Sequence, residues 1–137
     1  MLSEYRLRRR VNFYETDAAG LVHFSCFFRY MEEAEHALWR EAGLSIVPPD
    51  STVSFPRAAL SIEFKAPLFF EDEFEVHVRL TALSPRSLTY AHTITRGDTV
   101  IATGTMTAVC VGKSAGPMKA VEIPAAIRER LGIHAEG

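Results

Sequence analysis

Apolar and polar residues alternate through most of the second half of the chain, a pattern typical of strands with one buried face. The alternation is clearest over residues 73–80 and recurs at residues 60–65 and 88–94. A stretch rich in β-branched residues follows at 100–111. Gly97 and Asp98 lie between two of these runs and predict a hairpin turn. The pattern therefore predicts four successive strands joined mostly by short turns.

Two segments, each with its own spacing of apolar residues, precede these strands. Residues 4–14 alternate apolar side chains with arginines and predict a first strand, which the turn-like residues 17–20 end. From residue 25 to 42 the apolar positions recur at helical spacing, and Gly43 follows as a C-terminal cap. The charged residues of this helix are expected to mark its solvent side: Glu32, Glu33, Glu35, Arg40 and Glu41.

Residues 47–56 predict an irregular connection, and a short helix over 124–131 begins with Pro124. One strand, one long apolar helix and then several strands indicate an antiparallel sheet wrapped around the helix. We therefore predict an α+β fold and one domain over residues 1–137. The last strand has little difference between its two faces, so we expect a partner chain to cover one of them.

The composition and charge of the chain limit the classes of function to be considered. The net charge of −2, with 47% apolar and 23% charged residues, is ordinary for a globular protein and indicates no nucleic-acid partner. We interpret the basic stretch 6–10 as a solvated strand edge or a weak phosphate attractor. Two isolated cysteines predict a reducing compartment, and no apolar run approaches the ~20 residues of a membrane span. We expect a cytoplasmic protein with no membrane partner, and the histidine spacing predicts no metal site.

The segment from Arg10 to Phe24, with Thr16-Asp17-Ala18-Ala19-Gly20-Leu21-Val22 directly before the long helix, carries the most specific motif. It resembles the signature of the 4-hydroxybenzoyl-CoA thioesterase family of hotdog-fold acyl-CoA thioesterases, and the resemblance extends over roughly residues 5–131. The resemblance implies a hotdog fold, a curved antiparallel sheet of five to six strands around a long central helix. It also implies a homodimer with one continuous sheet or a dimer-of-dimers homotetramer, an acyl-CoA tunnel at the subunit interface, and no cofactor beyond the coenzyme A of the substrate.

By motif position, Asp17 matches the catalytic aspartate of the family and would act as nucleophile or as general base; the sequence leaves both roles open. The backbone amide of Phe24, near the start of the helix, would donate to the oxyanion. Thr16 and Gly20 have supporting roles near the substrate in this interpretation. The structural alternative is a turn in which Asp17 only caps local amides.

Other candidates follow from the same resemblance. Glu32 matches the glutamate of the family's helix, and His23 is a polar group near Asp17. Arg86 and Arg57 are candidates for binding coenzyme A phosphates. The chain departs from the family pattern at three positions, because Glu15 stands where aspartate is frequent, Phe24 where histidine or tyrosine is frequent, and Cys26 where a small polar residue is usual.

Thioester hydrolysis is the first functional hypothesis, and two alternatives stay open. The first is a non-catalytic acyl-CoA binding protein, since a fold alone does not imply activity. The second is a hotdog hydratase or dehydratase, for which His23 would have to act together with a carboxylate. The thiol carrier, coenzyme A or a carrier protein, is also open, and so is the acyl group, for which six phenylalanines are candidate pocket residues: Phe24, Phe27, Phe28, Phe55, Phe69 and Phe70.

Overall fold

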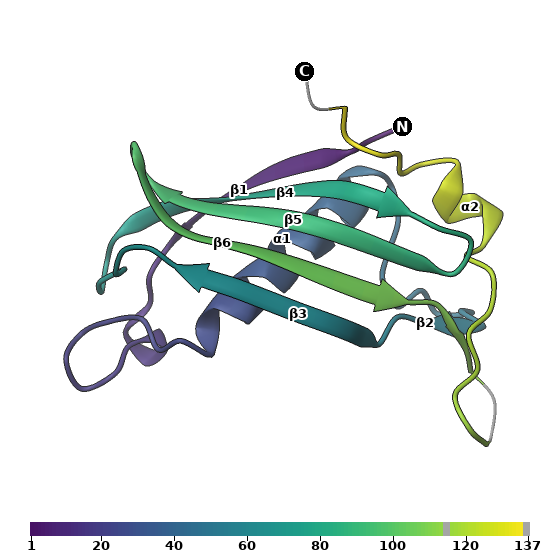
Figure 1. Ribbon diagram of the computed structural model, residues 1–137, viewed down its shortest axis with the longest axis horizontal. Coiled ribbons are helices and arrows are strands. Elements are labelled where there is room, and N and C mark those ends of the chain that lie inside the picture. The colour runs from purple at the N-terminus through teal and green to yellow at the C-terminus, as the bar shows by residue number, and fades with distance from the viewer. Residues whose placement is uncertain (114–115, 136–137) are drawn as a thin grey trace.

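A computed structural model describes residues 1–113 and 116–135, so the predicted domain of residues 1–137 includes a few residues outside the described part. Figure 1 shows a broad sheet with one long helix behind it. In chain order the elements are β1 (Glu4–Arg10), the 3-10 helix η1 (Phe13–Glu15), α1 (Cys26–Glu41), β2 (Val53–Ser54), β3 (Arg57–Phe64), β4 (Glu73–Leu83), β5 (Ser87–Arg96), β6 (Thr99–Val109), β7 (Val111–Gly112) and α2 (Ala125–Arg128).

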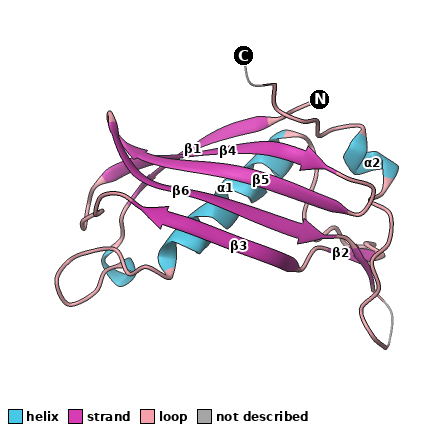
Figure 2. Ribbon diagram, in the orientation of Figure 1, coloured by secondary structure: helices cyan, strands magenta, loops and turns pink. Residues whose placement is uncertain are grey.

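The five long strands form one antiparallel sheet in the order β1-β4-β5-β6-β3, and β2 pairs with β7 in a small second sheet. Helix α1 crosses the inner face of the large sheet, and the strands curve around it (Figure 2). The predicted hairpin turn is present, with Gly97 at a φ of +57°. The α+β architecture of a sheet wrapped around a central helix is thus confirmed.

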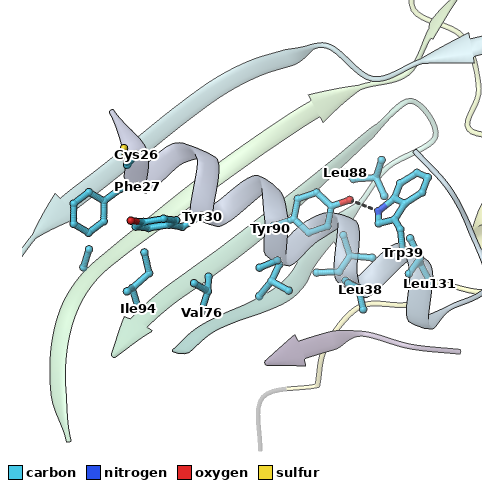
Figure 3. Packing of buried hydrophobic residues seen from close by; sticks show 14 of the residues in the cluster. Cys26, Phe27, Tyr30, Leu38, Trp39, Val76, Leu88, Tyr90, Ile94 and Leu131 are labelled. Carbon is cyan, nitrogen blue, oxygen red and sulfur yellow. Dashed lines mark hydrogen bonds between the residues drawn. The ribbon is translucent and has the colours of Figure 1, made fainter. Parts of the chain in front are cut away.

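The core lies between α1 and the inner face of the sheet, where side chains of helix and strands point toward one another (Figure 3). Because side chains alternate along a strand, Val76, Val78 and Leu80 are buried while their neighbours along β4 are not. At the C-terminal end of the helix, the buried Trp39 indole donates a hydrogen bond of 2.9 Å to the Tyr90 hydroxyl.

Two predicted boundaries were wrong. The first strand ends at Arg10 instead of residue 14, because Glu15 accepts a hydrogen bond from the Asn12 amide and residues 13–15 close into a 3-10 turn. The C-terminal helix spans Ala125–Arg128 and is shorter than the predicted 124–131. Ile127 and Leu131 are nevertheless buried, so the whole segment packs on the end of the core.

Two charged residues predicted to be solvated face the interior instead, Glu35 fully buried and Arg9 15% exposed. Glu35 lies on the inner side of α1, fully buried, and forms a two-pronged ion pair with Arg57 of β3. Arg9 differs from the other arginines of the basic stretch 6–10, because its side chain points inward and pairs with Glu15. Burial of an unpaired charge costs free energy. Here each charge is paired, Glu35 with Arg57 and Arg9 with Glu15.

The two edges of the large sheet differ in chemistry. On the outer face of β1, Arg6 and Arg10 are exposed and pair with glutamates of β4, as expected for a solvated edge. At the opposite edge, β3 carries the exposed apolar side chains Leu60 (43%) and Phe64 (52%). Strand β3 therefore presents unpaired backbone groups beside an apolar surface.

Within the described residues, no helix is long and apolar enough to cross a membrane.

Candidate active site

The motif residues form a tight loop between η1 and α1. Thr16 pairs with Val22 as an antiparallel bridge, and the Asp17 amide donates to the Leu21 carbonyl at 2.7 Å. A second segment holds the loop from outside, because the Val22 amide donates to Leu68 and the Gly20 carbonyl accepts from Phe70. The loop is thus fixed by backbone bonds on both sides of the motif aspartate.

The Asp17 carboxylate has two unequal oxygens. Oδ1 accepts hydrogen bonds from the amides of Ala19 (2.9 Å) and Leu21 (3.2 Å), the turn-capping geometry that aspartate favours. In the described part of the chain, Oδ2 accepts no hydrogen bond, and the residue is exposed. Capping of local amides therefore occupies one oxygen, fixes the orientation of the group and leaves the other oxygen for a ligand.

Thr16 and Gly20 shape this loop. The Thr16 hydroxyl donates to the Phe13 carbonyl at 2.7 Å and closes the 3-10 turn, so it serves the backbone. Gly20 has a φ of +79°, a conformation that side-chain-bearing residues rarely adopt, and a Cβ added there would meet open space. The glycine is needed for the backbone turn and not to relieve crowding.

The start of α1 leaves one amide free. The amides of Ser25, Cys26 and Phe27 donate to His23 Nδ1, the His23 carbonyl and the Phe24 carbonyl respectively. No hydrogen bond within the described residues uses the Phe24 N–H. Unpaired amides at a helix start lie at the positive end of the helix dipole. The predicted oxyanion donor is therefore available, although the Phe24 ring is exposed to solvent.

His23 contributes to the same helix start. Its Nδ1 lies 2.7 Å from the Ser25 hydroxyl and accepts the Ser25 amide at 3.3 Å, while its ring packs on Phe24 with centroids 4.5 Å apart. These contacts give the imidazole a local capping role. None of them joins it to the Asp17 carboxylate.

Glu15 anchors both ends of the motif. Its carboxylate is 8% exposed, accepts the Asn12 amide through Oε1, and receives Arg9 Nη1 at 2.8 Å on Oε2. Its backbone carbonyl accepts the His23 amide at 2.9 Å. Glu15 lies two residues before Asp17, and its carbonyl binds the residue directly before Phe24.

Two other predicted residues lie elsewhere along α1. Glu32 is half exposed, with Oε2 3.5 Å from Arg57 Nη2. At 1.5 Å per residue, it is about 12 Å along the helix axis from Phe24. Arg57 is occupied by the buried Glu35, so a phosphate would have to compete with that carboxylate. Coenzyme A binding by Arg57 stays a prediction.

Arg86 is exposed in the turn between β4 and β5. That turn lies at the opposite end of the sheet from the Asp17 loop (Figure 1). The 11 residues of β4 lie between the two ends; at 3.3 Å per residue, they span about 36 Å. One chain therefore does not bring Arg86 and Asp17 together.

Exposed aromatic side chains surround the motif loop. Phe13 packs edge-on against Phe70 with centroids 5.4 Å apart, and Phe69 pairs with Leu21 through the backbone. Of the predicted pocket residues, Phe24, Phe69 and Phe70 are thus exposed near Asp17. Two others belong to the interior, because Phe27 is buried and Phe55 packs on Trp39. An exposed aromatic surface of this kind is typical of a binding site or an interface.

A depression of about 560 Å³ lies where β1 ends, close to this region, and its lining includes Arg9, Phe74 and Gly97 but not Asp17. Among the described residues, no group of three His, Cys, Asp or Glu side chains is arranged to hold a metal ion. The chemistry available to the loop is therefore that of a carboxylate oxygen, an unpaired amide and aromatic surface.

The ion pairs that support the site were not predicted from the sequence. Arg9 falls in step with Tyr5 and Leu7, the inward positions of β1, and with the buried Val11 that follows the strand. An arginine at an inward position is a signal for a buried carboxylate partner. Glu35 carries the same kind of signal, because it falls four residues after the buried Met31 on one face of α1.

Comparisons with known proteins cover the whole site. A family model of the thioesterase-like superfamily matches residues 11–131, which include the motif loop and α1. A protein of Aquifex aeolicus, named as a presumed esterase, is 38% identical over 125 residues, 90% of this chain and 94% of that protein.

Two relatives carry more specific names. A 1,4-dihydroxy-2-naphthoyl-CoA hydrolase of Microcystis aeruginosa is 27% identical over 120 residues, 86% of each chain. The solved structure of a gentisyl-coenzyme A thioesterase is 29% identical, with a TM-score of 0.78, and the match covers 90% of this chain and 99% of that one. The similarity extends over nearly the full length of these proteins.

Proposed function

The chain belongs to the thioesterase-like superfamily and has the hotdog fold, and on this basis we propose that it hydrolyses an acyl-CoA to the free acid and coenzyme A. Membership makes it a thioester hydrolase. Asp17 and the Phe24 amide are the groups we assign to the reaction. The aromatic surface around the loop and the aromatic acyl groups in the names of its relatives support an aromatic acyl-CoA as substrate.

The observation that carries this proposal is that one short segment, residues 17–24, contains both an oriented carboxylate and an amide without an acceptor. Two amide N–H groups fix Oδ1 of Asp17, and no donor within residues 1–113 and 116–135 binds Oδ2. Of the amides from Phe24 to Phe27, that of Phe24 is the one without an acceptor in the same described ranges. An unpaired donor at the positive end of a helix is suited to the negative charge that develops on a thioester oxygen.

Two routes are consistent with this geometry. In the first, Oδ2 attacks the carbonyl carbon, the C–S bond breaks, the thiolate takes a proton from water, and water then cleaves the anhydride to regenerate Asp17. In the second, Asp17 takes a proton from a water whose oxygen attacks the carbonyl carbon, and that proton passes to the leaving thiolate. In both routes the Phe24 amide stabilises the oxyanion.

We further propose that a second copy completes the site. The edge strand β3 carries free backbone groups and the exposed Leu60 and Phe64, which suits pairing with β3 of a partner into one continuous sheet. The exposed aromatic residues around Asp17 would then be covered by that partner. Arg86, remote from Asp17 within one chain, would meet a coenzyme A phosphate only if the partner supplied it. A cytoplasmic location remains part of the proposal.

The test is release of free thiol from a panel of acyl-CoAs that includes 1,4-dihydroxy-2-naphthoyl-CoA, gentisyl-CoA and aliphatic chains. Asp17→Asn keeps the shape of the side chain and should lower kcat by about 10²–10⁴-fold. Asp98→Asn, an exposed aspartate in the β5–β6 turn, is the matched control and should leave kcat unchanged. Retained activity in Asp17→Asn would exclude the assigned role.

The same panel separates the alternatives. Tight binding of acyl-CoA without thiol release would indicate a binding protein, and turnover of a crotonyl-type thioester without thiol release would indicate a hydratase. Acyl-carrier-protein thioesters measured beside the coenzyme A forms decide the thiol carrier. Label in the Asp17 carboxylate after a single turnover in ¹⁸O-labelled water would identify the anhydride route, because water that cleaves the anhydride at the enzyme carbonyl leaves its oxygen there.

A further inference from the structure

Glu15 is connected to both groups that we assign to the reaction. Along the chain it lies two residues before Asp17, at the end of the 3-10 turn that leads into the motif loop. Across the loop, its carbonyl accepts the His23 amide at 2.9 Å and lies 3.6 Å from Cys26 Sγ, on either side of Phe24 and Ser25. A shift of the Glu15 backbone would therefore move the entry to the loop and the start of the helix together.

The Glu15 side chain prevents such a shift. One oxygen accepts the Asn12 amide at 2.8 Å, and the other receives Arg9 Nη1 at 2.8 Å. Both oxygens are thus used within the protein, in contrast to the half-free carboxylate of Asp17. A charge-assisted bond of this length is among the stronger ones available to a side chain.

Arg9 in turn is held from three directions. Its Nε lies 3.0 Å from Glu33 of α1, and its guanidinium stacks 4.6 Å from the ring centroid of the buried Tyr30. Burial alone lowers the pKa of Arg9, but the bond to Glu15 and the charge of Glu33 raise it above its ordinary value. The cation is therefore permanent and joins β1, α1 and the motif loop.

We propose that the Arg9–Glu15 pair positions the Asp17 carboxylate relative to the Phe24 N–H, and that these two residues determine the rate of the thioester reaction without touching the substrate. This inference rests on the proposed function, since it concerns the geometry of the same two groups. A misplacement of about 1 Å in a reacting group can cost about 10²-fold in rate. The pair would act through the loop backbone.

The variants Glu15→Gln and Arg9→Met test the proposal in the full-length protein, with folding followed by circular dichroism at the assay temperature. Each should lower kcat by about 10²-fold while KM stays within about twofold, because the acyl-CoA contacts are retained and only the reacting geometry changes. The double variant should be no slower than either single one, since both changes break the same link. Arg9→Lys, which keeps the charge, should recover part of the lost kcat.

A matched control comes from the second buried pair. Glu35→Gln breaks the ion pair between α1 and Arg57 of β3 and should lower the melting temperature without changing kcat. If Glu15→Gln behaves like Glu35→Gln, with reduced stability and wild-type kcat, the pair has only a structural role and the inference is wrong. Additive losses in the double variant would equally contradict a single shared link.

Failure of this inference is distinguishable from failure of the proposed function. If Asp17→Asn retains thiol release, the assignment of the reacting groups is wrong. There is then no catalytic carboxylate at residue 17 for Arg9 and Glu15 to position. If Asp17→Asn is inactive while Glu15→Gln keeps wild-type kcat, the reacting groups stand and only the positioning role is excluded. A loss of kcat in Glu15→Gln, with partial recovery in Arg9→Lys, supports both.

Discussion

Within the described residues, two arginine–carboxylate pairs with a buried carboxylate lie on either side of α1, and they differ in what they join. Arg57 and Glu35 link two regular elements, the edge strand β3 and the helix, with the carboxylate fully enclosed. Arg9 and Glu15 link a strand to a loop; Arg9 and Arg57 are similarly exposed, at 15% and 19%, and the Glu15 carboxylate is 8% exposed. The same chemistry therefore stabilises a seam between packed elements in one case and the conformation of an irregular segment in the other.

The largest loss of stability is expected from breaking the pair of Arg57 and Glu35. Arg57→Met leaves the Glu35 carboxylate buried without its partner, which should lower the free energy of unfolding by about 3–5 kcal/mol. Urea denaturation measures this loss. Combining it with Glu35→Met should restore most of the stability, because an apolar pair carries no desolvation penalty. A double variant as unstable as the single one would show that the pair itself, and not the orphaned charge, matters.

Breaking the loop pair should cost less stability. Arg9→Met removes the cation beside Glu15, whose carboxylate keeps some contact with solvent. Loss of a hydrogen bond to a charged group typically costs about 1.5–3 kcal/mol. Denaturation under the same conditions compares the two sites directly. If Arg9→Met proved as destabilising as Arg57→Met, the two pairs would contribute equally to stability and the expected difference between them would be excluded.

Acidification should lower the free energy of unfolding through the buried His92 of β5. Neither ring nitrogen has a hydrogen-bond partner in the described structure. Burial lowers the pKa of His92 to about 3, with the charges of Arg79 and Arg57 acting in the same direction and the Met31 backbone in the opposite one. The unfolded chain binds a proton near pH 6.5 and the folded chain does not, so stability falls as pH drops below 6.5. Between neutral pH and pH 5 the loss should be about 2 kcal/mol.

Replacing the histidine isolates this contribution. In His92→Leu the pH dependence between 7 and 5 should be smaller than in the wild type by the same amount, as measured by urea denaturation at each pH. Equal slopes for the two proteins would exclude His92 as the cause. His77, whose pKa burial also lowers, is present in both and cancels in the difference.

The smallest loss of stability is expected from a substitution in the motif loop itself. Gly20→Ala meets no neighbouring atom, so its cost is the backbone conformation at φ +79°, about 1 kcal/mol. Gly43→Ala has a similar φ but places its Cβ 2.7 Å from Arg130 Nη1, and should cost more. Thermal unfolding of the two variants separates backbone strain from crowding.

Most of the fold was predictable because its elements repeat a period. The alternation along β4 and β5 and the helical spacing of α1 identified those elements within a few residues. The end of β1 was not predictable from alternation, since the capping bond between Glu15 and Asn12, and not the hydrophobic pattern, turns the chain after residue 10. Short capped segments of this kind leave no periodic trace.

The site was predictable only in its motif. Asp17 before the helix and an unpaired amide near Phe24 followed from the resemblance and from the geometry of helix ends. Which amide stays free depends on His23, whose ring captures the Ser25 N–H, and no spacing in the sequence indicates that. The pairing of Arg57 with Glu35 depends on how β3 packs on the helix, a relation between segments that local pattern does not contain.

The indole buried against Tyr90 gives the protein a built-in optical reporter. Trp39 is the single tryptophan of the chain and lies at the far end of α1 from the motif loop. Its emission should shift to longer wavelength when the interior opens to water, yet stay constant when a ligand occupies the loop. Intrinsic fluorescence can therefore monitor unfolding of the interior without a label.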